Sequence, residues 1–429
     1  SGYHHIVASY NNNSYVVYID NEWRPRIVKI TNEGNSEEVF LDDEDYHLLE
    51  NDSHQFFAIG VDEKGYIHVL GDMHNFPRYH SDHLPDRYSN AKCMYWRSDN
   101  PEDISNFTWH GENFGDCPWG TSFTYPQIFY DQNGRLYFST RVRSETEKQY
   151  AAVNYNRYNA DKQQWELIGG TNEYDNMCLF WEDNGEGGGT YSKPCRSLHF
   201  DLNNTAHFVS SLYNSDRDKP FPENGGKYNT DLVYAASDDF GDSFKRADGS
   251  SVETIPMRID EAEKRPDVIR SNTIIRATNS DAITDYNGVP YALGDEHAEN
   301  GDLKHFCYAF NSSNNTWDDV SELRPQARGY FTADRMGVIT FFEIGTNKVH
   351  RLFDFGQAQV LDFGFFDIGV DRRHLIETGN IRGIPKRTNA SQPFQLIEVE
   401  IERPFSYPEM GDELSDNAYL NSLSIDTGI

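Results

Sequence analysis

The feature that most limits the fold of this chain is a short hairpin unit that returns along the sequence. Each copy opens with an aspartate, passes through a polar turn, and continues into about five β-favouring residues. Asp62, Asp131, Asp201 and Asp285 open four of these turns, at separations of 69, 70 and 84 residues. Helical periodicity is nearly absent between them. The pattern is typical of β-hairpins and predicts an all-β protein.

The spacing of the hairpins favours a β-propeller over a β-sandwich. Periods of this length, each containing several strands, are typical of propeller blades. Dividing the 429 residues by seven leaves about 61 residues per blade, which is enough for four strands and their loops. We therefore expect a seven-bladed β-propeller, with six or eight blades left open by counting. No linker or low-complexity tract interrupts the chain, so residues 1–429 are expected to form one domain.

A second motif supports the same architecture. Residues 237–244 fit the S-x-D-x-G-x-[ST]-[FW] pattern of an Asp box. Asp239 would cap the amides of the turn, Gly241 would take a positive φ, and Phe244 would pack between sheets. Turn chemistry explains each of these residues, so the motif predicts a role in folding rather than in catalysis.

Composition excludes several classes of partner. Lys and Arg total 38 against 69 Asp and Glu, which gives a net charge of −31. A nucleic acid or an anionic membrane surface would be repelled by such a protein. No run of about 18 apolar residues is present, so a transmembrane helix is not expected. The five cysteines form no CxxC pair and do not suggest a disulfide framework.

Polar residues at the ends of innermost propeller strands are the candidates for chemistry, because those strands line the central funnel. We take the strand after each Asp turn as innermost. The polar residues toward the ends of these four strands are Asp72 and His74, Arg141 and Arg143, Ser210 and Tyr213, and Asp295 and His297. His54 lies one strand earlier, and Tyr125 lies just before the hairpin that delivers Arg141. Two histidines, a tyrosine and an arginine at one mouth could remove a proton next to a carboxylate. For His68, His199 and His350 we favour a structural role.

Five segments carry a family resemblance. They are residues 65–69, 72–74, 94–98, 124–127 and 136–141, and they resemble the BNR-repeat propeller group that contains ulvan lyases. The similarity is strongest to polysaccharide lyase family 25, with family 24 as a relative, and is dense over roughly residues 50–145. The step of 20 residues from His54 to His74 and the step of 16 from Tyr125 to Arg141 agree with the family site. Residues 142–145 replace the usual Gly-rich stretch, so contacts from that loop are not carried over.

The resemblance implies a β-elimination on ulvan, a polymer of rhamnose 3-sulfate and glucuronic or iduronic acid. Arg141 would pair with the uronate carboxylate and stabilise the enolate-like charge. A base would remove the C5 proton while an acid protonates the departing O4. Tyr125 fits the acid and, for glucuronate, both roles; His54 fits a base for iduronate. His74 would help to hold the carboxylate or orient a partner, and no cofactor is needed for catalysis.

An anionic sulfated polysaccharide is the expected partner, and a chain of net charge −31 can bind it only through a locally basic groove. The expected contributors are Arg78, Arg87, Arg97, Arg143, Arg196 and Lys193, with Tyr213 and His297 as further substrate contacts. By analogy we expect a monomeric protein of a marine bacterium. By the same analogy we expect a secreted or periplasmic protein. Residues 1–6 show no secretory signal, so we expect that the signal was removed before residue 1.

A structural metal ion is a further expectation. Cys195 and His207 flank one hairpin turn, and with His199 they offer thiolate and imidazole ligands suited to zinc. His305 and Cys307 are another source of such ligands. The alternative is a buried cysteine among structural histidines, and the many Asp and Asn turns suit calcium equally well.

Two other functions compete with the lyase. A sialidase-like glycoside hydrolase needs two carboxylates, for which Asp72 and Asp295 are the candidates. A non-catalytic carbohydrate-binding propeller needs none. The product separates the three readings, because a lyase alone makes an unsaturated uronate that absorbs ultraviolet light.

Overall fold

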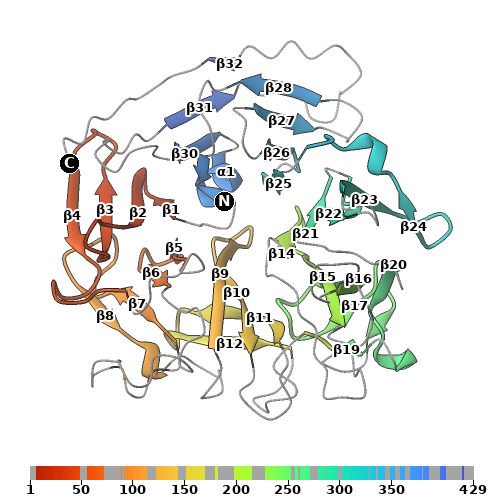
Figure 1. Cartoon of the computed structure of the whole chain (residues 1–429), viewed down its shortest axis with the longest axis horizontal. Coiled ribbons are helices and arrows are strands. Elements are labelled where there is room, and N and C mark those ends of the chain that lie inside the picture. The colour runs from red at the N-terminus through yellow and green to blue at the C-terminus, as the bar shows by residue number, and fades with distance from the viewer. Residues whose placement is uncertain are drawn as a thin grey trace.

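Short antiparallel sheets arranged in a ring make up almost all of the described chain (Figure 1). The structure, a computed structural model, describes residues 6–48, 56–71, 88, 91, 93–113, 122–143, 151–169, 179–181, 198–214, 228–252, 257–258, 261–270, 279–285, 287–297, 302–327, 329–334, 337–343, 348–352, 358–362, 368–378, 380–385, 397–401 and 418–419. In these residues no helix is long and apolar enough to cross a membrane.

Six sheets in the described residues have four antiparallel strands, and each is named here by its first strand. The β1 sheet holds β1 (Val7–Tyr10), β2 (Asn13–Ile19), β3 (Pro25–Ile30) and β4 (Ser36–Phe40). The β5 sheet holds β5 (Ala58–Val61), β6 (Ile67–Leu70), β7 (Tyr95–Ser98) and β8 (Phe107–Trp109). The β9 sheet holds β9 (Ser122–Tyr130), β10 (Leu136–Arg143), β11 (Ala151–Asn159) and β12 (Gln164–Ile168).

The later sheets repeat the pattern. The β21 sheet holds β21 (Asn279–Thr284), β22 (Pro290–His297), β23 (Leu303–Asn311) and β24 (Thr316–Asp319). The β25 sheet holds β25 (Gly329–Ala333), β26 (Ile339–Glu343), β27 (Lys348–Leu352) and β28 (Ala358–Asp362). The β29 sheet holds β29 (Ile368–Val370), β30 (Ile381–Pro385), β31 (Ile397–Ile401) and β32 (Ala418–Tyr419).

One sheet is larger, and a few elements lie outside the pattern. The six-stranded β14 sheet holds β14 (Leu198–Phe200), β15 (Ala206–Asn214), β16 (Tyr228–Ser237), β17 (Phe244–Lys245), β18 (Ser251–Val252) and β20 (Asp267–Arg270). Strands β13 (Phe180–Trp181) and β19 (Met257–Arg258) form a parallel pair. The described helices are α1 (Arg372–Thr378) and the 3-10 turns η2 (Gly111–Asn113), η4 (Ala262–Lys264) and η5 (Ser321–Leu323).

The first strand of each sheet lies nearest the centre of the ring, and later strands lie progressively further out (Figure 1). The all-β prediction and the predicted hairpins are therefore confirmed, and the arrangement is that of a propeller. The strand that follows each Asp turn is the second of its sheet, so the prediction that these strands are innermost was wrong by one strand. Alternating apolar residues look alike in both strands of a hairpin and do not tell which one faces the axis.

The Asp turns are built alike in successive sheets. Oδ1 of Asp62 accepts hydrogen bonds of 2.9 and 2.8 Å from the amides of Lys64 and Tyr66. Asp131, Asp201 and Asp285 cap the amides two and four residues ahead in the same way. Asp334 caps the amide of Val338. An aspartate is favoured here because its short carboxylate reaches the turn amides that the strand ladder leaves unpaired.

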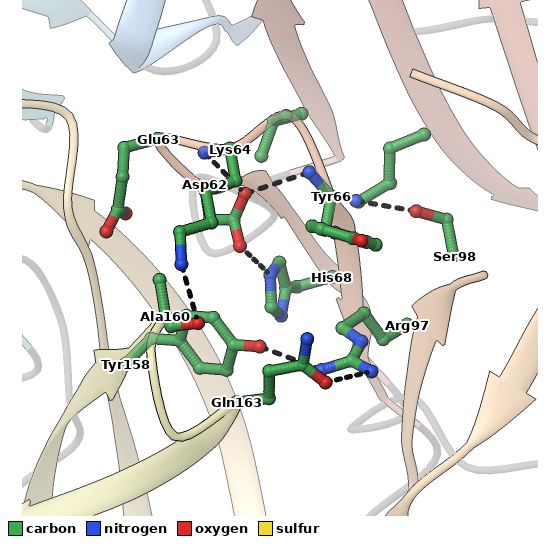
Figure 2. Close-up of polar contacts among 12 residues, drawn as sticks. Asp62, Glu63, Lys64, Tyr66, His68, Arg97, Ser98, Tyr158, Ala160 and Gln163 are labelled. Atoms are coloured by element: carbon green, nitrogen blue, oxygen red, sulfur yellow. Dashed lines mark hydrogen bonds and ion pairs between the residues drawn. The ribbon is translucent and has the colours of Figure 1, made fainter. Parts of the chain in front are cut away.

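The caps also organise buried networks of three side chains. His68 Nε2 lies 3.3 Å from Asp62 Oδ2 (Figure 2). His68 Nδ1 lies 2.8 Å from the Tyr95 hydroxyl. The β14 sheet repeats this network with Asp201, His207 and Tyr234, at 3.4 and 2.6 Å. Both copies follow the spacing D-x5-H-x26-Y. His68 is thus a satisfied structural histidine, as predicted.

Apolar side chains fill the spaces between neighbouring sheets. One cluster joins the β1, β5 and β9 sheets and includes Tyr15, Trp96, Phe138 and Trp165, each almost fully buried. A second joins the β9 and β14 sheets. The Asp box contributes Phe244 to this second cluster, while Asp239 Oδ1 accepts a 2.8 Å hydrogen bond from the Ser243 amide. Its predicted folding role is confirmed.

The ring is closed by a buried polar cluster around α1. Helix α1 packs against β1, β9, β25 and β30 and lies beside the centre of the ring (Figure 1). Asp371, placed where other sheets have their Asp turn, caps the His374 amide at 3.0 Å and accepts a hydrogen bond from Ser9 of β1. Arg382 of β30 also donates to Ser9, at 3.2 Å. Among the described strands, none pairs with both the β1 sheet and the β29 sheet. The hydrogen bonds of Ser9 with Asp371 and Arg382 join these two sheets instead.

Arg373 of α1 extends the closure to the β5 sheet. It is buried, and its Nη1 donates to the carbonyls of Val61 and Asp62. Its guanidinium carbon lies 4.6 Å from the ring centroid of Tyr10. We predict that Arg373→Ala lowers the free energy of unfolding by about 3 kcal/mol, because buried carbonyls lose a charged donor. Urea unfolding measures this.

The matched control for Arg373 is Arg246→Ala. Arg246 also donates to backbone carbonyls, but to those of Ser251, Ala262 and Arg265 in its own part of the chain. A smaller shift in the urea midpoint is expected for this variant. Equal shifts for both variants would contradict the closing role of Arg373.

Stability should also fall in mild acid. Burial lowers the pKa of His68, with Asp62 partly opposing it, and lowers the pKa of His110 to about 4. The unfolded chain takes up these protons near pH 6.5, whereas the folded chain does so only at lower pH. The free energy of unfolding should therefore fall as the pH drops below about 6.5, and His110 alone should account for about 1 kcal/mol between pH 7 and pH 5.5.

Urea unfolding at the two pH values tests this, with His68→Gln as the comparison. The variant should lose less stability than the wild type over the interval. An equal loss in both proteins would show that His68 does not contribute to the pH dependence.

Candidate functional site

A β-bulge places Tyr125 at the inner edge of the β9 sheet. Gln127 pairs with Ser139 and Thr124 pairs with Arg141, so Tyr125 and Pro126 together stand opposite Thr140. Tyr125 has φ of 60°, a left-handed value that a bulky aromatic residue rarely adopts. Bulges re-aim side chains and are common beside active sites. The side chain of Tyr125 is buried, with 6% of its surface exposed.

Arg141 lies directly beside this bulge. Its guanidinium carbon is 4.8 Å from the centroid of the Tyr125 ring, and the residue is buried. Both residues lie toward the strand ends that are away from the Asp131 turn. A cation over an aromatic ring is attracted to the negative face of the ring. The structure therefore brings together the predicted acid and the predicted carboxylate-binding group.

Buried polar side chains are found on the two strands that carry this pair and on the next strand of the same sheet. They are Gln127 on β9, Ser139 and Thr140 on β10, and Asn154 and Asn156 on β11. Gln127 Nε2 donates to the Pro126 carbonyl at 3.0 Å, and Asn156 donates to Asn154. Asn154 pairs with Thr140, so it lies on the opposite face of the sheet from Arg141. Buried polar groups are costly unless hydrogen bonds satisfy them.

Phe56 also packs on the Tyr125 ring, and the sequence reading did not identify it. Phe56 lies two residues before β5, in the neighbouring sheet, and its ring centroid is 5.4 Å from that of Tyr125 with 34° between the planes. Nothing in the sequence marks this contact, because it crosses two sheets. The bulge itself has one signal in the sequence. Tyr125 precedes Pro126 inside a strand pattern, and a proline at such a position is typical of a bulge or an edge strand.

Several predicted site residues lie outside the described residues. They are the catalytic candidates His54 and His74, the substrate-binding candidates Arg78 and Arg196, and the metal candidate Cys195. Asp72, Arg87 and Lys193 lie outside them as well. The structure therefore does not test whether these residues join Tyr125 and Arg141.

Three further candidates are placed by their backbone. Arg143 is the last residue of β10, Tyr213 lies near the end of β15, and His297 is the last residue of β22. Each is on the second strand of its sheet, at the end away from the Asp turn. This is the end at which Arg141 lies, so these positions share one face of the ring.

Arg97 occupies a different environment from the one predicted for a substrate contact. Its guanidinium donates to the Tyr158 hydroxyl at 2.9 Å and to Gln163 Oε1 at 3.1 Å (Figure 2). It also lies 5.4 Å from the Tyr66 ring centroid. These contacts join the β5 and β9 sheets, so Arg97 contributes to packing between them.

The metal candidates that the structure describes are held by protein groups. His199 and His207 face each other on β14 and β15, with ring centroids 6.3 Å apart. His199 Nε2 lies 2.9 Å from the Thr284 hydroxyl, and burial lowers the pKa of this histidine to about 3. Both nitrogens of His207 face partners, Tyr234 and Asp201. Among the described side chains no three His, Cys, Asp or Glu residues gather around a common point suited to a metal ion.

Asp295, the candidate carboxylate for a hydrolase, is engaged with a histidine and an arginine. Its Oδ1 lies 2.7 Å from Nδ1 of His305, directly across the strand pair, and 3.6 Å from Nη2 of Arg324. Arg324 in turn donates to the carbonyls of Gly294 and Phe306. The carboxylate is 1% exposed, so it is part of a buried charged cluster.

Known structures share the fold of the chain. The crystal structure of polysaccharide lyase Uly1 superposes with a TM-score of 0.66 at 14% identity, over 92% of this chain and 89% of that one. A family 25 polysaccharide lyase, an ulvan lyase bound to a glucuronate–rhamnose 3-sulfate repeat, superposes with a TM-score of 0.53 at 13% identity, over 81% and 78%. No curated protein matches the sequence. At these identities the likeness shows the fold alone.

The family assignment comes from the sequence itself. The family model described as BNR repeat-containing family member matches residues 13–323, which include the four Asp turns opened by Asp62, Asp131, Asp201 and Asp285 and the Asp box. This match spans well over half of the chain. The protein belongs to the BNR repeat-containing family.

Proposed function

We propose that this protein is a polysaccharide lyase that cleaves ulvan by β-elimination at its 4-linked uronate. The observation that carries the proposal is the contact between Tyr125 and Arg141 at a β-bulge in the β9 sheet. The guanidinium carbon of Arg141 lies 4.8 Å from the centroid of the Tyr125 ring. The fold shared with a lyase bound to a glucuronate-containing oligosaccharide supports it. Membership of a propeller family alone would not, because propellers carry many functions.

β-Elimination at a uronate requires a cation and a group that can donate and accept a proton at adjacent positions. Arg141 pairs with the uronate carboxylate and stabilises the negative charge that develops when C5 loses its proton. The electron pair of the C5–H bond forms the C4–C5 double bond, and the C4–O4 bond breaks. Tyr125 protonates the departing O4 and, for glucuronate, also removes the C5 proton. The buried environment of both groups strengthens their electrostatic effect.

His54 and His74 complete the proposed site on sequence grounds. His54 serves as the base for iduronate, which presents its C5 proton on the opposite face of the sugar ring. His74 holds the carboxylate or orients a partner. The proposal assigns no step to a metal ion; zinc or calcium would have a structural role, with Cys195, His199 and His207 as the candidates for zinc.

The anionic polymer would bind along the face of the ring that carries Tyr125 and Arg141. Arg143, Tyr213 and His297 lie at or near the ends of their strands on that face. They are proposed substrate contacts, together with Arg78 and Arg196. Local positive charge is required there, because the chain as a whole carries −31. We further propose one domain of seven blades, a count supported by the six four-stranded sheets and the six-stranded sheet of the described residues.

Incubation with ulvan tests the proposal. A rise in ultraviolet absorbance from the new C4–C5 double bond, unaffected by a chelator, is expected. Shortened polymer without the absorbance would favour a hydrolase instead. Saturable binding of intact polymer would favour a carbohydrate-binding propeller.

Substitution of the pair gives a sharper prediction. Tyr125→Phe and Arg141→Ala should each lower kcat about a hundredfold or more, because each removes a group that acts in the transition state. Initial rates of absorbance change measure the effect, with circular dichroism to verify folding.

Tyr330→Phe is the matched control for the tyrosine. Tyr330 is a buried tyrosine on β25, the first strand of another sheet. Near-native turnover is expected for this variant. Near-native turnover of Tyr125→Phe would remove Tyr125 from the mechanism.

A further inference from the structure

The backbone at Tyr125 needs support from its surroundings. A φ of 60° in an aromatic residue is held only where neighbouring groups over-determine the conformation. Pro126 follows, so the next residue has a fixed φ and no amide hydrogen to place in the ladder. Pairing of β9 with β10 resumes on both sides of the bulge and holds its ends. These features fix the backbone but leave the direction of the ring to side-chain packing.

Two ring contacts of Tyr125 differ in origin. Arg141 belongs to the strand paired with β9, so it moves together with the bulge. Phe56 belongs to the segment that enters β5 and contacts Tyr125 from the adjacent sheet. The centroid separation of 5.4 Å and the tilt of 34° lie in the range of favourable aromatic pairs. Phe56 thus ties the Tyr125 ring to a second sheet.

Phe56 and its neighbour Phe57 have different contacts. Phe57 is a member of the apolar cluster that joins the β1, β5 and β9 sheets, and it packs against the backbone of Gly71. Phe56 is also buried, with 8% of its surface exposed, and its ring packs on that of Tyr125. A large, rigid, buried side chain that contacts the Tyr125 ring from another sheet limits the directions in which that ring can point.

We infer that Phe56 is a positioning residue that fixes the phenol of Tyr125 between the β5 and β9 sheets. This inference rests on the proposed function for its catalytic consequence. Proton transfer requires donor and acceptor within hydrogen-bond reach, and a displacement of about 1 Å costs about a hundredfold in rate. Removing the Phe56 ring takes away one packing contact of the Tyr125 ring, so the phenol is held less firmly near the reacting atoms, while Arg141 still binds the carboxylate.

The test compares Phe56→Leu with Phe56→Tyr and with a control pair. Phe342 and Tyr330 form another buried Phe–Tyr pair, on β26 and β25, with centroids 4.9 Å apart. Phe342→Leu therefore removes a matched ring far from Arg141 in sequence. Should Phe56→Leu fail to fold, Phe56→Met keeps a large apolar side chain without the ring and takes its place.

The first readout does not depend on activity. The protein is labelled with 3-fluorotyrosine, and the Tyr125 resonance is assigned by its loss in Tyr125→Phe. Phe56→Leu should shift or broaden this resonance, whereas Phe56→Tyr should restore it and Phe342→Leu should leave it unchanged. An unchanged Tyr125 resonance in Phe56→Leu would overturn the inference, whether or not the protein is a lyase.

The second readout is the kinetics on ulvan. Phe56→Leu should lower kcat at least tenfold and change KM less than twofold, because substrate binding through Arg141 persists. Phe56→Tyr should retain most of kcat. A shifted resonance with an unchanged kcat would refute the catalytic part of the inference. Absence of unsaturated product from the wild-type protein would refute the proposed function, and the fluorine resonance would still decide whether Phe56 holds Tyr125.

Discussion

The carboxylate-capped turn is the interaction on which the ring depends. In successive sheets an aspartate accepts hydrogen bonds from amides further along the turn that joins the first strand to the second. A turn fixed in this way sets the register of the two strands, and register decides which side chains face each neighbouring sheet. In three of these turns the residue six positions after the aspartate lies beside its second oxygen, namely His68, His207 and Tyr291. One local bond therefore determines the packing between sheets.

Two departures from the repeat among the described residues have a clear consequence. At Asp371 the cap begins helix α1 instead of a hairpin, and the helix carries Arg373 into the seam between sheets. At Tyr125 a bulge interrupts the regular pairing of β9 with β10. That bulge turns an aromatic ring under Arg141 and toward Phe56. The regular positions explain the fold, and the irregular ones explain closure and the candidate site.

Much of the fold could be predicted from the sequence, because turns and alternation are local. The hairpins opened by Asp62, Asp131, Asp201 and Asp285 and the Asp box all form as expected. The order of strands from the axis could not be predicted, since both strands of a hairpin show the same alternation. The repeated D-x5-H-x26-Y spacing was present in the sequence and marks the buried histidine networks.

The candidate site divides in the same way. The family resemblance, with which the 16-residue step from Tyr125 to Arg141 agrees, implied that these residues act together, and the structure brings them into contact. The contact with Phe56 depends on two sheets packing side by side, so it required the structure. Arg97 illustrates the opposite case. Its charge suggested a substrate contact, whereas the structure shows it bonded to Tyr158 and Gln163.

The most direct test of the central claim is mass spectrometry of the ulvan fragments released in water enriched in oxygen-18. Elimination at a site built from Tyr125 and Arg141 adds no water, so the account predicts unlabelled fragments. Each would be lighter than a hydrolysis product by one water and would carry an unsaturated uronate. Fragments that contain oxygen-18 at the new reducing end would contradict the account, because they would show hydrolysis of the glycosidic bond.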